Sequence, residues 1–403
     1  MLKSYNLGGI IGRMTKLEKT SIFIQALFNF SNAMYSMFVS VYLYIYTDSL
    51  VKMTIYTLIR VTAIPISLYL GGKIARKHSL TATFGLGLSF QTISLIYTLT
   101  ASPLFLKNSS YVYLAAIPMG IGEGLYYYSQ NVMNQVVTTA SRRAHYLSFL
   151  GFFNNCAGLL APLLANRIIA YSDSDLIAYR KILAILSVIF FIITIVSLSI
   201  KVKAESKEIN IKKSLNLSNS EWFDQLKSTF FHAFREALNW SIIPILLSSF
   251  SGDGSIYSTA QTIFSIINVV LFLTLVKSLK HDKINKTFFI GMLLTCISGI
   301  ALVLLENLVG VIIYGICNCL SSVFYENSYS YLQANVLEKY KSDLSGRLIA
   351  KEIAIYIGRC LASLFIILCF NILPTNIYYK VPIILYSLTP YLVYKIMIKY
   401  NEN

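Results

Sequence analysis

Residues 20–46 of the chain read TSIFIQALFNFSNAMYSMFVSVYLYIY, and no charged side chain interrupts this run. A helix needs about 20 mostly apolar residues to cross the hydrocarbon core of a bilayer. Eleven further runs of similar character follow, near residues 52–72, 80–102, 109–137, 144–171, 179–200, 227–250, 256–277, 286–306, 308–335, 346–371 and 378–398. One such run could be a buried helix of a soluble protein. Twelve in succession predict an all-α membrane protein with twelve transmembrane helices.

The composition of the 403 residues agrees with this prediction. Hydrophobic residues make up 56% of the chain and charged residues only 13%, against about 25% in an ordinary soluble domain. A disordered chain needs low hydrophobicity and dense charge, so that class is excluded. The 20 glycines and 6 cysteines are too few for a collagen-like chain or a disulfide-rich scaffold.

The charge of the chain is strongly basic, with 34 Lys and Arg residues, 18 Asp and Glu residues and a net charge of +16. In a soluble protein this excess would suggest nucleic-acid binding. Here the basic residues gather in both termini and in every second loop, while the other loops hold only Lys52, Lys107, Arg180, Lys181 and Lys380. Lys and Arg are retained on the cytoplasmic side of a membrane. We therefore expect a multi-pass protein of the plasma or inner membrane, with both termini in the cytoplasm and no nucleic-acid partner.

A polar stretch, residues 201–226, divides the predicted helices into two sets of six. The sets are weakly similar: residues 126–131 (YYYSQN) end the fourth helix, and residues 325–330 (YENSYS) end the tenth. Each segment is followed by a short basic loop and another long apolar run. We expect an N-terminal half in residues 1–200, a cytoplasmic linker in 201–226 and a C-terminal half in 227–403.

With this organisation the chain resembles the major facilitator superfamily. Residues 71–77 (GGKIARK) are similar to the glycine and basic residues of a signature that the family often carries between helices 2 and 3, without its acidic residue. Residues 158–162 (GLLAP) resemble the Gly-Pro motif of proton-driven exporters, with Ala in place of the usual Gly. The resemblance implies two pseudo-symmetric halves, a central cavity lined by helices 1, 4, 7 and 10, and transport by alternating access.

Polar side chains follow one face of each of these four helices, at spacings typical of a helical face. The residues alone define these faces, and we expect them to line the substrate cavity. They are Asn29, Asn32 and Ser36 in the first helix, Tyr127, Gln130, Asn131 and Asn134 in the fourth, Arg235, Asn239 and Trp240 in the seventh, and Tyr325, Tyr329 and Ser330 in the tenth. The alternative for the Asn, Gln and Ser side chains is that they hold helices together by hydrogen bonds.

Charged residues at membrane depth are costly, so their presence there indicates function. Glu123, Glu236 and Glu326 lie well inside the fourth, seventh and tenth predicted helices. Loss of water disfavours the charged form of a carboxyl group, so a glutamate in a partly dry cavity can take up a proton on one side and release it on the other. We predict that these three residues couple transport to protons. Arg60 and Arg359, in the second and eleventh helices, are expected to form ion pairs that change with the conformational state.

No enzyme motif is found in the sequence. The segment 120–124 (GIGEG) lies inside a predicted span, so we interpret it as a site of close helix packing and not as a phosphate-binding loop. The four histidines and six cysteines lack the spacing of metal ligands, so we expect neither a metal site nor a cofactor.

The sequence favours a proton-coupled secondary transporter that acts as a monomer. The motif at 158–162 favours export, and aromatic cavity faces with carboxylates favour a small amphipathic or cationic solute held by cation–π contacts. Three alternatives stay open. They are proton-coupled uptake of a small polar solute such as a sugar, peptide or acid, a flippase for lipids or lipid-linked molecules, and a non-transporting receptor with the same fold.

Overall fold

The computed structural model describes residues 14–137, 140–202, 218–275, 284–339 and 344–400 of the chain. Most of these residues are helical, and the described part contains no strand. Helices stand at each of the twelve predicted spans, so the all-α class and the number of spans are confirmed. Of the helices in the described ranges, eight are long and apolar enough to cross a membrane by length and composition.

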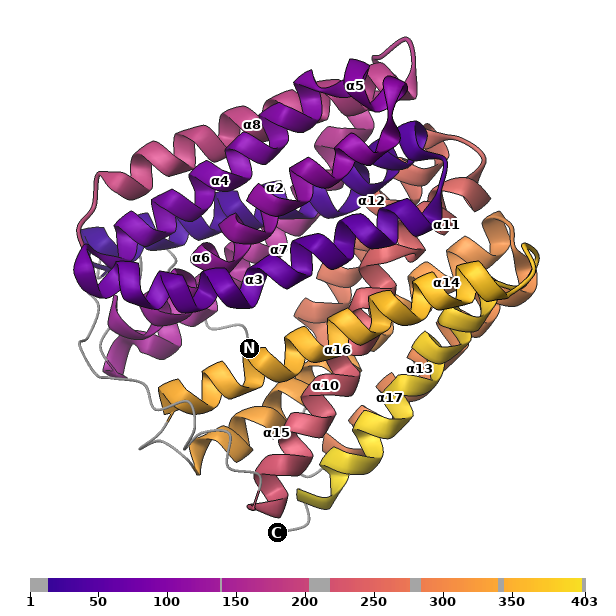
Figure 1. Cartoon of the computed structure of the whole chain (residues 1–403). Coiled ribbons are helices and arrows are strands. Elements are labelled where there is room, and N and C mark those ends of the chain that lie inside the picture. Colours follow the sequence, from indigo (N-terminus) through magenta and orange to yellow (C-terminus); the bar gives the residue numbers. More distant parts are fainter. Residues whose placement is uncertain (1–13, 138–139, 203–217, 276–283, 340–343, 401–403) are drawn as a thin grey trace.

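The helices before residue 201 form what we term the N-terminal bundle (Figure 1). They are α2 (Lys16–Thr47), α3 (Leu50–Lys77), α4 (Leu80–Thr100), α5 (Ser102–Lys107), the 3-10 turn η1 (Ser109–Val112), α6 (Tyr113–Val136), α7 (Ala140–Ala170) and α8 (Asp175–Leu198). Short polar residues precede four of the α-helices, because their side chains accept hydrogen bonds from free backbone N–H groups of the first turn. These caps are Thr15 for α2, Ser49 for α3, Ser79 for α4 and Ser174 for α8.

The described helices after residue 217 form the C-terminal bundle. They are α10 (Ser220–Ser241), α11 (Ile243–Ser251), α12 (Gly254–Leu275), α13 (Ile284–Leu305), α14 (Leu308–Ser321), the π-helical turn η4 (Ser322–Glu326), α15 (Asn327–Glu338), α16 (Leu344–Ile372), α17 (Lys380–Met397) and the 3-10 turn η6 (Ile398–Tyr400). Pro244 lies where α10 gives way to α11, because proline lacks the backbone N–H that continues a helix. η4 interrupts the tenth predicted span with a wider turn, a feature often found at functional sites.

Each bundle packs mainly within itself (Figure 1). In the N-terminal bundle, α6 packs on α3 and α4, and α2 packs on α7 and α8. In the C-terminal bundle, α10 packs on α16 and α17, and α13 packs on α14 and α17. The main contacts between the bundles join α3 to α16 and α7 to α12. The linker limits at 201–226 stay a prediction, since residues 203–217 lie outside the described residues.

Glycines bring α6 close to its neighbours. A Cβ atom at Gly120 would collide with the backbone oxygen of Arg60 in α3. A Cβ atom at Gly122 would collide with the backbone oxygen of Gly87 in α4. The interpretation of residues 120–124 as a segment of close helix packing is therefore confirmed.

The two ends of the bundles carry different residues. Figure 1 shows the start of α10 and the end of α17 on one side of the molecule, and α5 and α11 on the other. We term the first side the basic end, because Arg76, Lys77 and Lys395 lie in the last helical turns there. At the opposite end, Lys380 pairs with Glu306, and the hydrogen bond from the ammonium group lowers the pKa of the Glu306 carboxyl.

Candidate functional site

A cavity of about 320 Å³ lies between the two bundles. Its walls in the N-terminal bundle include Asn32, Tyr35, Ser36, Ser40, Arg60 and Tyr127, from α2, α3 and α6. Its walls in the C-terminal bundle include Asn239, Trp240, Tyr257, Gln261, Tyr314 and Asn318, from α10, α12 and α14. Because both bundles form the walls, a movement of one bundle against the other changes the shape of the cavity.

Part of the predicted substrate site lies on these walls. The predicted residues found there are Asn32, Ser36, Tyr127, Asn239 and Trp240. Their role in binding a solute stays a prediction. Asn131 and Ser330 are exposed and lie apart from the cavity walls.

Three predicted cavity residues instead join helices of the N-terminal bundle. The Gln25 amide donates to Oδ1 of Asn134 at 2.9 Å, and the Gln130 amide donates to Oε1 of Gln25 at 3.1 Å. Asn29 donates to Oδ1 of Asn154 at 2.5 Å. These bonds link α2 to α6 and α7. They match the alternative role of such amides, which is to hold membrane helices together.

Tyr329 lies in a comparable polar cluster of the C-terminal bundle. Its hydroxyl donates to Oγ1 of Thr229 at 3.3 Å and accepts a hydrogen bond from the Gln333 amide at 3.0 Å. The Lys351 ammonium donates to Oε1 of Gln333 at 2.7 Å. This cluster joins α10, α15 and α16, so Tyr329 contacts helices and not the central cavity.

Arg60 and Glu123 form a bidentate ion pair between α3 and α6. The guanidinium donates from Nε to Oε2 at 2.9 Å and from Nη2 to Oε1 at 2.6 Å. The Glu123 side chain is only 3% exposed. Arg60 also lies 5.3 Å from the ring centroid of Tyr35, whose hydroxyl shares a hydrogen bond of 2.8 Å with Tyr56. The pair thus fixes the arginine at the edge of the cavity.

Arg235 and Glu326 form a second ion pair, between α10 and η4. The guanidinium lies 5.0 Å from the ring centroid of Tyr325 and 5.7 Å from that of Tyr386. The Glu326 side chain is 37% exposed, which makes it the most exposed of the three predicted proton-coupling carboxylates. Arg235 and Tyr325 are both predicted to line the cavity, but neither lies on its walls. Arg235 instead pairs with Glu326 and lies over the ring of Tyr325.

Arg359 and Glu236 form a third ion pair, between α16 and α10. Nη2 of the guanidinium donates to Oε2 of the carboxylate at 2.9 Å. The guanidinium also lies 4.4 Å from the ring centroid of Trp240, which lines the cavity. Both arginines predicted to form ion pairs, Arg60 and Arg359, thus have a carboxylate partner within their own bundle. Their response to the conformational state stays a prediction.

His232 connects the two ion pairs of the C-terminal bundle. Its Nε2 atom lies 3.7 Å from a carboxylate oxygen of Glu236 and 3.6 Å from one of Glu326. The imidazole stacks on Tyr329 with 4.4 Å between ring centroids. His232 is not among the residues predicted from the sequence, although residues four apart, such as His232 and Glu236, share one helix face. The imidazole thus lies between the carboxylates of Glu236 and Glu326.

Three hydrogen bonds join the bundles toward the end opposite the basic end. They run from the Gly254 N–H to Oδ2 of Asp175 at 3.0 Å, from the Ser258 hydroxyl to Oδ1 of Asn166 at 3.1 Å, and from the Tyr257 hydroxyl to the backbone oxygen of Met37 at 3.3 Å. They connect α12 with α8, α7 and α2. The bundles are therefore held together on this side of the cavity.

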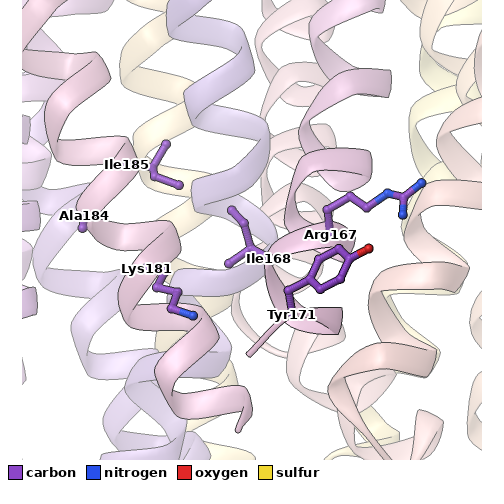
Figure 2. A pocket seen from close by; sticks show the side chains of 6 residues that line it. All are labelled: Arg167, Ile168, Tyr171, Lys181, Ala184 and Ile185. Atoms are coloured by element: carbon purple, nitrogen blue, oxygen red, sulfur yellow. The ribbon is translucent and has the colours of Figure 1, made fainter. Parts of the chain in front are cut away.

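Figure 2 shows a second hollow, of about 530 Å³, between α7 and α8. It is lined by Arg167, Ile168, Tyr171, Lys181, Ala184 and Ile185. The guanidinium of Arg167 points away from the ammonium group of Lys181 in Figure 2. This hollow shares no lining residue with the central cavity, and its charged groups do not converge, so we assign it no part in the site.

The described residues hold no group of three or more His, Cys, Asp or Glu side chains that could bind a metal ion. The six cysteines are free thiols. The cavity walls present amide and hydroxyl groups, aromatic rings and one guanidinium, that of Arg60, which is already paired with Glu123.

Comparison with known proteins identifies a family and several structures with the same fold. The family described as Major Facilitator Superfamily matches residues 21–361. The crystal structure of the nucleoside transporter NupG has a TM-score of 0.68 and 9% sequence identity, and the match covers 96% of this chain and 100% of that one. The xylose transporter XylE from E. coli, in a partially occluded inward-open conformation, has a TM-score of 0.69 and 14% identity, with coverages of 95% and 97%. A bacterial homologue of the iron transporter ferroportin, in an inward-facing state, has a TM-score of 0.66 and 14% identity, with coverages of 96% and 99%.

Two curated relatives are uncharacterized bacterial proteins. The protein YqgE of Bacillus subtilis (strain 168) is 22% identical over 270 residues, which are 66% of this chain and 62% of that protein. The protein of the sodM 3′ region of Geobacillus stearothermophilus is 25% identical over 133 residues, which are 33% of this chain and 61% of that protein. The match thus spans less than two thirds of each relative, and neither name states an activity.

Proposed function

The chain belongs to the major facilitator superfamily, and from this premise we propose that it is a secondary transporter of a small solute that works by alternating access. The observation that carries the proposal is the cavity between the bundles, whose walls come from both of them. The hydrogen bonds from α12 to α8, α7 and α2 support a state closed at the end opposite the basic end. Rocking of one bundle against the other would open that end and close the basic end.

Transport by the purified protein in liposomes tests this proposal. With an imposed pH gradient, we expect addition of a transported solute to produce a proton flux, measured with a pH-sensitive dye across a panel of solutes. Liposomes without protein provide the control. If no solute produces proton movement, and no labelled solute exchanges across the membrane, the protein is not a secondary transporter of this kind.

Proton coupling is part of the proposal and involves Glu123, Glu236 and Glu326. Glu326 is the most exposed of the three, and its ion-pair partner Arg235 lies on α10. The imidazole of His232 lies 3.6 Å from Glu326. A proton taken up by this cluster would neutralise the carboxylate and weaken its attraction to Arg235, which would loosen the contact between α10 and η4. Protonation would then change the packing within the C-terminal bundle, which is one of the two bundles that we propose to move against each other.

We propose that the basic end lies in the cytoplasm, because loops rich in Lys and Arg are retained there. Ser174 and Ser199 flank the two ends of α8. The variant Ser174→Cys should react with a membrane-impermeant maleimide added to intact cells, whereas Ser199→Cys should react only after permeabilisation. The parent protein shows the background from its native cysteines. If only Ser199→Cys is labelled in intact cells, the proposed orientation is wrong, and the basic end faces the outside.

Gly254 allows the close contact between α12 and the start of α8. A Cβ atom at Gly254 would collide with the Asp175 carboxylate. The variant Gly254→Ala should turn this carboxylate away from the Gly254 N–H and disfavour the closed end by about fivefold, because one lost hydrogen bond costs about 1 kcal/mol. A cysteine placed on the cavity wall by Ser36→Cys reports this change. In the Gly254→Ala background it should react faster than in the parent background with a maleimide added from outside.

Gly158 provides the matched control for this substitution, because a Cβ atom there meets nothing within 4 Å. Gly158→Ala should leave the reactivity of Ser36→Cys unchanged. Equal reactivity in the Gly254→Ala and parent backgrounds would show that the Gly254–Asp175 contact does not hold this end closed.

Export, favoured by residues 158–162, and the monomeric state stay predictions. The similarity to solved structures described as transporters supports transport over a receptor role. The liposome assay separates export from uptake, because the required direction of the proton gradient differs between them.

A further inference from the structure

The charges at the central cavity are neutralised by the protein itself. Arg60 lies on the wall, and both Nε and Nη2 donate to the Glu123 carboxylate. Behind the opposite wall, Arg359 donates to Glu236 at 2.9 Å. A charged solute would have to displace a partner from one of these pairs, and removing one partner of a buried pair leaves an uncompensated charge. This arrangement favours a neutral solute.

Two of the aromatic faces at the cavity are occupied by cations of the protein. The guanidinium of Arg60 lies 5.3 Å from the ring centroid of Tyr35, and that of Arg359 lies 4.4 Å from the ring centroid of Trp240. An aromatic face attracts a cation through the negative charge of its π-system, and these faces already have one. A cationic solute would gain little from these two faces, which weakens the case for the cationic class that the aromatic residues alone suggest.

Amide and hydroxyl groups form the polar part of the walls. The amides are Asn32, Asn239, Gln261 and Asn318, and the hydroxyls include Ser36 and Ser40. Oδ1 of Asn239 accepts a hydrogen bond from the Tyr314 hydroxyl at 2.9 Å, which leaves its N–H groups to donate. Among the described residues, the side chains of Asn32 and Gln261 form no hydrogen bond with the protein. An amide both donates and accepts hydrogen bonds, and so does a hydroxyl group of a solute.

We propose that this cavity binds a neutral ring compound bearing several hydroxyl groups, that is, a sugar ring. Its volume of about 320 Å³ is at the lower end of the roughly 300–1,000 Å³ of small-molecule sites. Tyr127 and Tyr257 line the cavity, and the apolar part of a tyrosine ring can pack against the face of a sugar ring while the wall amides pair with its hydroxyl groups. This inference rests on the proposed transport function and names the class of its substrate.

Equilibrium binding to the purified protein in nanodiscs tests the class directly. Glucose, its cationic analogue glucosamine and its anionic analogue glucuronate form a set matched in size, and ribose with uridine shows whether a base adds affinity. We expect at least one neutral probe to bind with a dissociation constant below about 10 mM, and glucose to bind about tenfold or more tightly than its charged analogues. The inference is overturned if a charged analogue binds as tightly as its neutral partner, or if no neutral probe binds.

Variants of the wall amides test the location of binding. Asn32→Ala and Gln261→Ala should each weaken binding of the best neutral probe by about three- to tenfold, the effect of one lost hydrogen bond. Asn29→Ala is the matched control on α2, because Asn29 bonds to Asn154 and does not line the cavity. Equal affinities in all three variants would place the binding site elsewhere. Thermal unfolding without ligand identifies any variant that fails to fold.

The failure of this inference can be distinguished from failure of the proposed function. Proton-linked transport of a charged solute, with no binding of neutral rings, overturns the inference and leaves the transporter function standing. Binding of a neutral ring without any transport or exchange overturns the transporter function and leaves the binding class standing.

Discussion

Replacing Arg60 with glutamine is expected to lower the free energy of unfolding by about 3–5 kcal/mol, the cost of removing one partner of a buried ion pair. Glu123 is 3% exposed and receives two hydrogen bonds from this guanidinium. Without Arg60, its carboxylate would be left between α3 and α6 with no cation. The change should appear as a lower midpoint of thermal unfolding in detergent and as less folded protein in membranes.

Two further variants make this prediction specific. Arg167→Gln removes an exposed arginine near the end of α7 and should leave the midpoint almost unchanged. The double variant Arg60→Gln with Glu123→Gln should recover much of the lost stability, because no charge is then left without a partner. If Arg60→Gln is as stable as Arg167→Gln, the ion pair does not hold α3 against α6.

Replacing Glu326 with glutamine is expected to abolish transport driven by a proton gradient, while exchange of solute without a gradient continues. Glutamine has nearly the shape of a protonated glutamate, but it cannot release a proton. The Glu326 side chain is 37% exposed, and the amide oxygen of glutamine can still accept a hydrogen bond from Arg235, so the fold should tolerate this change better than the loss of Arg60. Accumulation of solute and exchange of labelled solute, measured in the same proteoliposomes, separate the two activities. His232→Gln should act in the same direction, because His232 contacts the same carboxylate.

Glu221 provides a control carboxylate on the same helix. It lies in the first turn of α10 and pairs with Lys339 at 2.7 Å, so Glu221→Gln should keep gradient-driven transport. Glu123→Gln should lose it, as Glu326→Gln does. If both Glu123→Gln and Glu326→Gln pump normally, these residues do not couple transport to protons. The proton would then have to use Glu236, the remaining predicted carboxylate.

The candidate site could be predicted from the sequence only in part. Helical spacing groups the polar residues by face, and five of the predicted cavity residues, Asn32, Ser36, Tyr127, Asn239 and Trp240, lie on the cavity walls. A polar face, however, runs along much of a helix, whereas the cavity occupies only part of that length. Other members of the same faces therefore contact neighbouring helices. Gln130 bonds to Gln25, and Tyr329 bonds to Thr229.

His232 and Gln261 show a second limit of the sequence. His232 belongs to the site because Glu326 approaches it from η4, which lies 94 residues away along the chain (326 − 232). Gln261 belongs to the cavity because α12 faces α2 and α10 across it. The local spacing of residues predicts neither the contact between His232 and Glu326 nor the position of Gln261 on the cavity wall, because both depend on how the helices pack.

The sequence by itself determined that helices stand at twelve spans, although it did not show that the seventh is interrupted at Pro244 and the tenth at η4. This is possible because the preference of a run of about 20 residues for the bilayer is a property of that run alone. Only the tertiary structure decided which charges neutralise one another: Arg60 with Glu123, Arg235 with Glu326, and Arg359 with Glu236. Ion pairing requires contact within a few ångströms between helices far apart in the chain, and that contact exists only once the helices have packed.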